Sequence, residues 1–132
     1  MLVYLDACTL IYLVEGDVAL VESVVRIIDR DDVRLVTSQL TRLECRVQPL
    51  RVGDVDLLGQ YERVFAAADL SLIEVTEAIL EGATEIRAKL GLKTPDAIHA
   101  ATAIEVGADL FVTGDDAFTR VRELRVELVA IS

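Results

Sequence analysis

The chain has 132 residues, a length that suits one domain and is too short for two domains of ordinary size. Hydrophobic residues make up 53% of the sequence, which is enough for a buried core and excludes an intrinsically disordered chain even at a net charge of −10. Seven glycines and two prolines exclude a collagen-like protein, and two cysteines exclude a disulfide framework and favour a reduced, cytoplasmic setting.

The apolar N-terminal run at residues 2–14 is predicted to belong to the folded domain. It lacks a basic leader and contains Asp6, and it is followed by Glu15 and Asp17 instead of a small-residue cleavage site, so it does not resemble a signal peptide. It is also shorter than the roughly 20 apolar residues needed to span a bilayer. We therefore expect a soluble protein without membrane contact.

Short apolar runs alternate with helical periods along the chain. From the N-terminus we predict a strand at 1–5, helices at 9–14 and 17–30, a strand at 33–36, a helix that begins after Thr37-Ser38 and ends near Pro49, and a loop at 49–53. There follow a helix at 54–68, a strand at 70–75, a helix at 76–90 that stops at Gly91, a helix from Thr94-Pro95 to about 106, a strand at 109–113, a short helix near 116–123 and a strand at 126–131. This alternation is typical of parallel βαβ units. It predicts a single α/β domain over residues 1–132, with a central parallel sheet between two helix layers in a three-layer α/β/α arrangement.

Two acidic residues follow predicted strands. Asp6 comes directly after MLVYL, and Asp115 comes after DLFVTG. In open α/β sheets ligands bind beyond the carboxyl ends of the strands, so a site is expected at this edge. A turn or a helix cap is the alternative role for each residue.

Two further acids lie on predicted helices. Glu44, in SQLTRLECRV, is near the apolar stripe of its helix, and its alternative role is an ion pair with Arg42 or Arg46. Asp96 lies in the first turn after Thr94-Pro95, where a favourable interaction with the helix dipole is the alternative.

Convergence of these acids in one cleft would favour a metal site. Clustered carboxylates repel one another, and a divalent cation relieves that repulsion. Oxygen ligands without paired cysteines or histidines favour Mg²⁺ or Mn²⁺ over zinc. The isoelectric point of about 4.4 argues against nucleic-acid binding through a basic surface, but an acidic pocket can meet phosphates through bound cations.

The motifs that carry these acids resemble PIN-domain ribonucleases, specifically the VapC-like toxins of toxin–antitoxin pairs. The resemblance covers nearly the whole chain and rests on LDACTLIYL at the start, TRLE in the first third, TPDAIHAATAI near residue 100 and FVTGDDAF after it. Carried over by position, it makes Asp6, Glu44, Asp96 and Asp115 the metal-binding and catalytic acids and Thr113 the small hydroxyl residue before the last acid. It implies a dimeric, Mg²⁺-dependent endoribonuclease, with Mn²⁺ as a substitute, that leaves 3′-hydroxyl and 5′-phosphate ends and is inhibited by a small antitoxin.

Four further side chains lie near these motifs. Asp116 either supports the site through a water molecule or places a charge at a helix N-terminus. His99 shares a helix face with Asp96, and packing within its apolar helix is favoured over a role as general base. Cys8 and Cys45 are expected to be small buried apolar residues.

Other kinds of protein also place acids at strand ends. A phospho-acceptor receiver domain needs paired acids after its first strand and a lysine after its last, whereas Ala-Cys-Thr follows Asp6 and no lysine follows Lys93. The alternatives to a toxin are a non-catalytic PIN-fold module that binds a partner, which retention of the four acids disfavours, and a housekeeping RNA-processing nuclease. Wide apolar stripes at 17–30 and 54–68 predict a homodimer and a groove for an apolar antitoxin helix whose basic residue reaches the acids.

Overall fold

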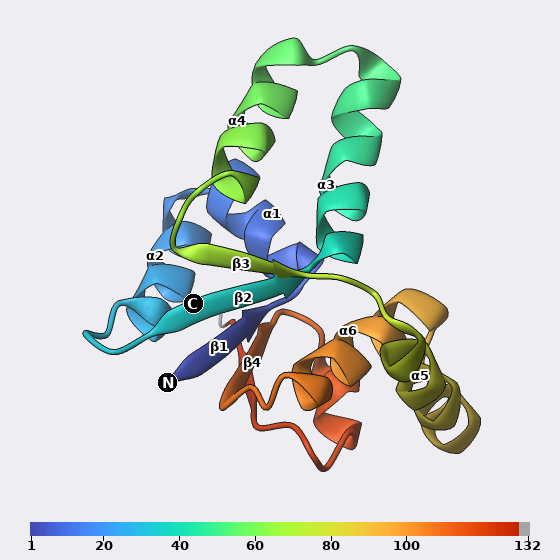
Figure 1. Ribbon diagram of the computed structural model, residues 1–132. Helices are drawn as coiled ribbons and strands as arrows, with labels where there is room; N and C mark the ends of the chain where they lie inside the picture. Colours follow the sequence, from blue (N-terminus) through green and yellow to red (C-terminus); the bar gives the residue numbers. More distant parts are fainter. Residues whose placement is uncertain (130–132) are drawn as a thin grey trace.

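The computed structural model describes residues 1–129. Within them, parallel strands form one sheet in the order β3-β2-β1-β4-β5 (Figure 1). The strands are β1 (Leu2–Leu5), β2 (Arg34–Ser38), β3 (Leu70–Ile73), β4 (Leu110–Thr113) and β5 (Val126–Leu128). The helices are α1 (Ala7–Glu15), α2 (Val18–Ile28), α3 (Gln39–Val52), α4 (Val55–Phe65), α5 (Glu77–Leu90), α6 (Thr94–Glu105) and the 3₁₀ helix η1 (Asp116–Arg120). The predicted α/β fold with a central parallel sheet is confirmed.

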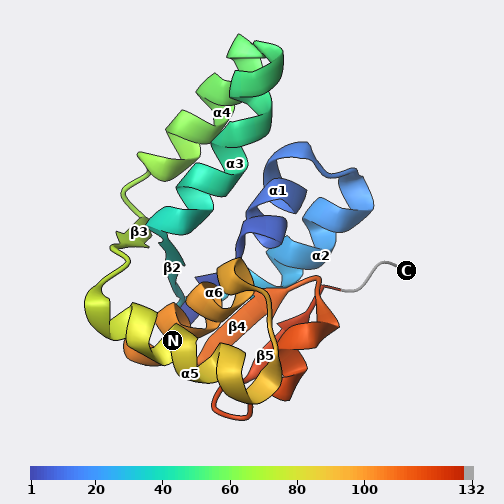
Figure 2. The ribbon, with the colours of Figure 1, turned by 90° about the vertical axis from the view of Figure 1, so that its right-hand side faces the viewer.

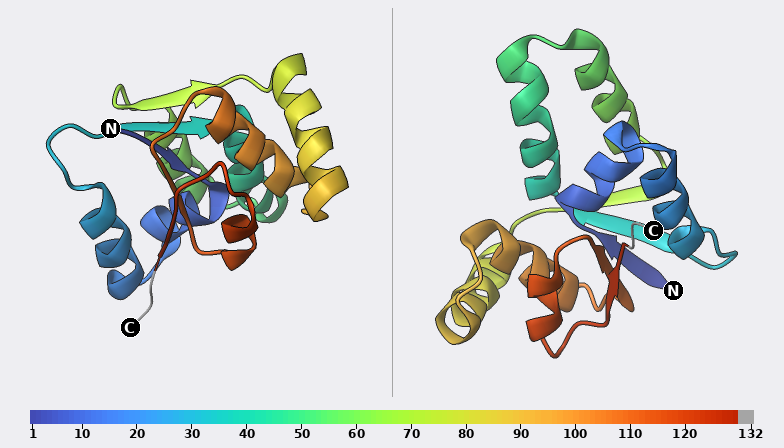
Figure 3. Two further views of the ribbon diagram at one scale, coloured as in Figure 1. Left: turned by 90° about the horizontal axis from the view of Figure 1, so that it is seen from below. Right: turned by 180° about the vertical axis from the view of Figure 1, so that it is seen from behind.

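Alternate residues of the central strands face opposite helix layers, as the pleat of a strand requires. Val3 and Leu5 of β1 pack into a core with α1, α2, α3 and α4, whereas Tyr4 packs into a second core with α5, α6 and η1. Figures 2 and 3 show these two groups of helices on opposite sides of the sheet. Strands buried on both faces explain the continuous apolar runs in the sequence.

Helix α3 is longer than predicted. The prediction that it ends near Pro49, followed by a loop at 49–53, is wrong, because α3 continues to Val52 with Pro49 buried inside it. Proline removes its own N–H from the helix and its ring crowds the preceding turn, but its carbonyl still accepts a hydrogen bond from the Asp54 N–H at 2.9 Å. Gly53, in the left-handed conformation at a φ of 71°, ends the helix instead.

Other boundaries also differ from the predictions: strand β2 extends to Ser38, β3 ends at Ile73, and α2 and α4 end at Ile28 and Phe65. Helix α1 begins at Ala7, earlier than the predicted residue 9, because Asp6 caps it. The short helix predicted near 116–123 is a 3₁₀ helix at Asp116–Arg120. Strand β5 ends at Leu128, and residues 130–131 of the predicted strand lie outside the described residues. No helix within residues 1–129 combines the length and apolar character needed to cross a membrane.

Gly91 ends α5 as predicted, in the left-handed region at a φ of 69°. Gly91→Ala should lower the free energy of unfolding by about 1–2 kcal/mol, because a Cβ is unfavourable in that conformation. Gly59→Ala is the matched control. Gly59 lies inside α4, where an added Cβ would meet only the Arg63 guanidinium at 3.6 Å, so that variant should gain about 0.5–1 kcal/mol. Urea unfolding measures both, and a change of the same sign in the two variants would contradict this account.

Candidate active site

The carboxyl ends of β1 and β4 lie side by side where the strand order reverses. From β1 the sheet adds β2 and β3 on one side, and β4 and β5 on the other. Ligands of open α/β sheets bind in the crevice at such a point. A cavity of about 330 Å³ lies here. It is lined by Asp6, Ala7, Cys8, Ile11, Glu44, Asp96, His99, Asp115 and Phe118. The four acids that the sequence motifs single out therefore share one cavity.

Asp6 is buried, with 4% of its surface exposed, and begins α1. Its Oδ1 accepts hydrogen bonds from the Thr9 backbone N–H at 3.0 Å and the Thr9 hydroxyl at 2.9 Å, so the helix-cap role is confirmed. The Cys8 thiol donates to the same oxygen at 3.1 Å, and the Thr113 hydroxyl donates to Oδ2. The cap and the cavity position are compatible, because the bonds that form the cap also fix where the carboxylate points.

Thr113, the last residue of β4, connects two of the acids. Its hydroxyl donates to Asp6 and accepts from the Asp115 backbone N–H at 3.0 Å. Asp115 in turn caps η1 by accepting from the Ala117 N–H at 2.9 Å. Asp116, the next residue, is exposed and does not line the cavity. The structure thus places Thr113 in a buried position between Asp6 and Asp115, and Asp116 at the start of η1, outside the cavity.

Glu44 lies on α3 and faces α6. Its Oε1 is 2.6 Å from Nε2 of His99. Arg42 and Arg46 instead lie 3.4 and 3.6 Å from the carboxylate of Glu62 on α4. Residues two apart on a helix point in different directions, so the two arginines face α4 while Glu44 faces the cavity. The ion pair of Glu44 with Arg42 or Arg46, considered from the sequence, is therefore wrong.

His99 is 2% exposed, which confirms that it packs within the apolar helix α6. Sequence reasoning missed that both ring nitrogens have side-chain partners. Nδ1 lies 2.6 Å from the Tyr4 hydroxyl, and Nε2 lies 2.6 Å from Glu44. The available signal was the spacing of three residues from Asp96, which places both side chains on one face of α6.

Asp96 lies in the first turn of α6, and its pKa is raised above the ordinary value of 3.8. Partial burial is the largest cause, followed by the negative charge of Asp115, and Asp6 and Glu44 act in the same direction while His99 opposes them. The effect shows that the four carboxylates are close enough to interact electrostatically. A role at the helix N-terminus alone would not raise this pKa.

The raised pKa of Asp96 predicts a dependence of stability on pH. The folded state holds the proton more tightly than the unfolded state, so the stability gained below the ordinary pKa is lost as pH rises through the raised value. Asp96→Asn should therefore flatten the decline in the free energy of unfolding from about pH 4 to pH 7 without divalent cations. Asp116→Asn, which changes an exposed acid outside the cavity, should keep the wild-type slope. Urea unfolding across this range provides the measurement, and parallel curves for wild type and Asp96→Asn would refute the coupling.

The two cysteines are protonated thiols in this environment. Burial raises the pKa of Cys8 to about 11 and that of Cys45 to about 12, and nearby carboxylates add to both shifts. Cys45 is buried in the core as expected, whereas Cys8 is half-buried and lines the cavity. A thiol is also a soft ligand, which Mg²⁺ and Mn²⁺ favour less than carboxylate oxygen.

Among known protein families, the PIN domain family matches this chain over residues 3–124. The chain belongs to this family. The resemblance noted in the sequence motifs is thereby confirmed. No curated protein sequence matches the chain significantly.

Several solved structures share the fold of this PIN domain. VapBC2 from Rickettsia felis, bound to a promoter DNA fragment, has a TM-score of 0.80 at 16% identity, covering 98% of this chain and 100% of that chain. A toxin–antitoxin complex from Klebsiella pneumoniae has a TM-score of 0.76 at 21% identity, covering 98% and 99%. VapC20 from Mycobacterium tuberculosis, described as a sarcin–ricin loop cleaving toxin, has a TM-score of 0.77 at 16% identity, covering 93% and 98%. The fold is thus that of VapC-type toxins.

The donor set of this PIN domain suits a hard divalent cation. The four acids offer only oxygen atoms, and the pKa of Asp96 is raised by partial burial and then by the negative charge of neighbouring acids, which a cation would offset. Within residues 1–129, no group of three or more acidic, histidine or cysteine side chains is already gathered closely enough to hold a metal ion. The acids share a cavity without forming a closed cage.

A larger cavity of about 380 Å³ lies between α5, α6 and the segment around η1. Its walls include Ile86, Leu90 and Ile104, and none of the four acids lines it. Glu85, Glu105 and Glu123 line it together with the basic residues Lys89, Arg120 and Arg122, so its charges are mixed. The smaller cavity has four acids without a lysine or arginine and lies at the switch point of the sheet, so it is the better candidate for chemistry.

Proposed function

We propose that this PIN domain is a metal-dependent endoribonuclease that hydrolyses RNA phosphodiester bonds. The observation that carries the proposal is the gathering of four carboxylates in one cavity at the switch point of the sheet. Asp6, Asp96 and Asp115 would hold the principal Mg²⁺ ion, or Mn²⁺ in its place. Glu44 would complete the site or position the attacking water.

The reaction requires a cation, a water molecule and a correctly held phosphate. A bound divalent cation supplies Lewis acidity toward a phosphoryl oxygen and lowers the pKa of water. The chain's part is to hold its acids in place: Thr113 and Thr9 fix the Asp6 carboxylate, and His99 bonds to Glu44. Both nitrogens of His99 already have hydrogen-bond partners, so this scheme assigns it no role as general base. Attack by water on phosphorus, with the bond to the 3′ oxygen broken and a proton passed to that oxygen, would leave 3′-hydroxyl and 5′-phosphate ends.

We further propose that the protein is the toxin of a toxin–antitoxin pair. Its structural neighbours include toxin–antitoxin complexes, and α3 carries an uncovered apolar stripe of Leu43, Val47 and Leu50, which are 55%, 41% and 60% exposed. This stripe runs along the same helix as Glu44, and the α3–α4 pair projects beyond the sheet (Figure 1). An apolar antitoxin helix on this stripe would bring a basic side chain within reach of the acids.

A homodimer is also proposed, on the basis of apolar residues that stay exposed. On α2, Val18 and Val25 are 72% and 41% exposed, whereas Val24 of the stripe predicted for residues 17–30 is buried, so that prediction is only partly right. On α4, Tyr61 and Phe65 of the predicted stripe are buried, and the exposed apolar residue is Val55, which precedes that stripe. The cytoplasmic location expected from the cysteine content stays a prediction.

The test is incubation of the purified protein with total cellular RNA in Mg²⁺, in Mn²⁺ and in EDTA, followed by mapping of the cleavage ends. Cleavage that requires the cation and leaves 5′-phosphates supports the nuclease. Intact RNA in every cation would favour a non-catalytic PIN-fold module. Cleavage without growth arrest on expression would favour a housekeeping RNA-processing nuclease over a toxin.

A further inference from the structure

A chain of buried hydrogen bonds links the core of the protein to the acidic cavity. The Tyr4 hydroxyl lies 2.6 Å from Nδ1 of His99, and Nε2 of the same ring lies 2.6 Å from Oε1 of Glu44. These residues come from β1, α6 and α3, which are distant in sequence. Tyr4 is fully buried, His99 is nearly so, and the Glu44 side chain is 29% exposed. The hydrogen-bonded series therefore runs from the buried core to the cavity wall.

We infer that His99 is a positioning residue that holds the Glu44 carboxylate at the cavity, with its second oxygen left to bind a divalent cation. This inference rests on the proposed metal-dependent function. It assigns His99 no contact with substrate and no proton transfer.

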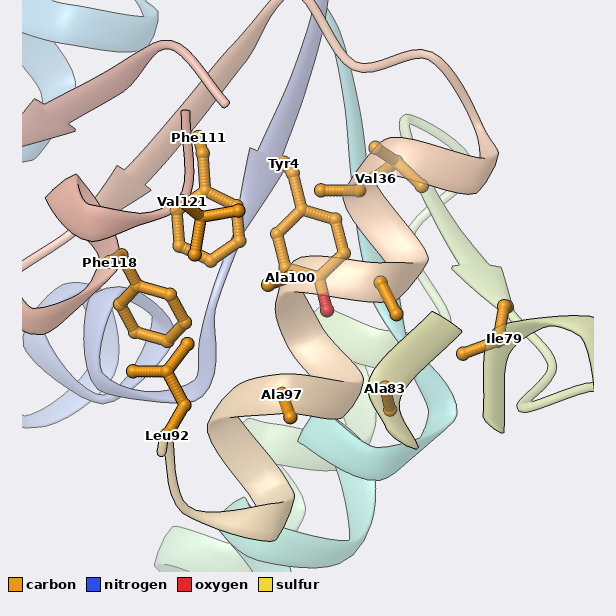
Figure 4. Close-up of a cluster of buried hydrophobic side chains, with 12 residues drawn as sticks. Tyr4, Val36, Ile79, Ala83, Leu92, Ala97, Ala100, Phe111, Phe118 and Val121 are labelled. Atoms are coloured by element: carbon orange, nitrogen blue, oxygen red, sulfur yellow. The ribbon is translucent and has the colours of Figure 1, made fainter. Parts of the chain in front are cut away.

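The core end of the chain is fixed by aromatic packing. Tyr4 and Phe111 are register partners on β1 and β4, and their rings stack at a centroid distance of 5.1 Å and an interplanar angle of 8°. Phe118 packs against Phe111, with the two ring centroids 4.6 Å apart. Figure 4 shows the Tyr4 ring beside Phe111 with its oxygen directed toward the helix that carries Ala97 and Ala100. A hydroxyl held in this way can orient the imidazole precisely enough to orient a third group.

The direction of each hydrogen bond follows from the groups involved. A carboxylate can only accept a hydrogen bond, so the proton between Glu44 and His99 is donated by Nε2. Nδ1 of the neutral ring is then an acceptor, and the Tyr4 hydroxyl donates to it. A histidine held between two partners has one tautomer and one ring orientation.

Glu44 has no competing partner among the described residues. The arginines on either side of it, Arg42 and Arg46, are directed at Glu62. Within residues 1–129 the one hydrogen bond recorded for its side chain is that to His99. Without this bond the partly exposed carboxylate would sample several rotamers, and ordering it would oppose metal binding. Groups that hold a metal ligand from behind typically change affinity by about 10–100-fold when removed.

Two substitutions of His99 test the hydrogen bonds of its two ring nitrogens separately. In His99→Gln the amide nitrogen lies near the position of Nε2 and keeps a donor for Glu44. In His99→Asn the amide lies near the position of Nδ1, faces Tyr4 and cannot reach Glu44. Mn²⁺ affinity, measured by electron paramagnetic resonance on the full chain, should fall by about 10–100-fold in His99→Asn and stay close to wild type in His99→Gln. Rescue by Gln is a result that a merely space-filling role of the ring would not produce.

Each outcome decides the inference. Equal Mn²⁺ affinity in wild type and in folded His99→Asn would overturn it and leave the proposed nuclease intact. Equal losses in the Asn and Gln variants would overturn it as well, because they would indicate a packing role. Absence of Mn²⁺ binding by wild type would remove both the inference and the proposed function. If circular dichroism shows that His99→Asn does not fold, Tyr4→Phe serves in its place, since it removes only the hydroxyl that orients the ring; unchanged affinity in that variant would again overturn the inference.

Discussion

Asp6→Asn should abolish RNA cleavage while the protein remains folded. Asparagine caps helices as well as aspartate does, and its carbonyl oxygen can still accept the two hydrogen bonds from Thr9. The side-chain amide can face the Thr113 hydroxyl in place of Oδ2. The variant therefore loses the charge of a proposed metal ligand and little else. We expect a loss of cleavage greater than the roughly 100-fold typical of residues that only support a ligand.

Asp116→Asn is the matched control for this prediction. It makes the same acid-to-amide change one residue beyond Asp115, at an exposed position outside the cavity. Cleavage of a labelled RNA in Mg²⁺ should be close to wild type in this variant. Wild-type cleavage by a folded Asp6→Asn protein would show that Asp6 does not hold the metal, and a loss of equal size in both variants would show that acid removal acts through the overall charge.

The sequence predicts the strand-end acids well because their position depends on local pattern alone. Apolar runs that alternate with helical periods imply parallel strands, and parallel strands place their carboxyl ends at one edge of the sheet. Asp6 and Asp115 each follow such a run. Their meeting in one cavity therefore needs no knowledge of side-chain contacts, only that β1 and β4 are neighbours, which the structure shows.

The pairing of Glu44 with His99 is beyond this kind of reasoning. The two residues are 55 positions apart and lie on α3 and α6, whose relative orientation is set by packing on the sheet and not by either helical period. Local pattern points to Arg42 and Arg46 as partners instead. The structure shows that α4, which packs antiparallel beside α3 in the same hairpin, presents Glu62 to both arginines. Partners chosen by tertiary packing override those suggested by sequence distance.

The apolar stripe of α3 illustrates a second limit. The spacing of Leu40, Leu43 and Val47 is typical of a core-facing helix. In the structure Leu43 and Val47 are 55% and 41% exposed, because much of α3 extends past the edge of the sheet (Figure 1). Periodicity shows that a face is apolar, but it does not show whether the chain itself or a partner covers that face.

Metal binding should be visible in the stability of the protein without knowledge of the RNA. Four carboxylates around one cavity repel one another in the absence of a cation, and the negative charges of the other three add to the effect of burial in raising the pKa of Asp96. A cation that binds only the folded state stabilises it by mass action. At 100 times its dissociation constant the gain is about 2.7 kcal/mol. For a domain of this length, that gain corresponds to a rise in melting temperature of roughly 10 °C.

We therefore expect Mn²⁺ and Mg²⁺ to raise the melting temperature of the wild-type protein, measured by circular dichroism or calorimetry. NaCl at equal ionic strength should do less, because screening weakens repulsion between the carboxylates without forming ligand bonds. The matched control is a quadruple variant with Asp6→Asn, Glu44→Gln, Asp96→Asn and Asp115→Asn, which should melt at a temperature independent of Mn²⁺. A wild-type melting temperature that does not change with Mn²⁺ would contradict the proposal of a metal site. An equal rise in the quadruple variant would place the cation elsewhere on this acidic protein, because removal of all four carboxylates would then leave binding unchanged.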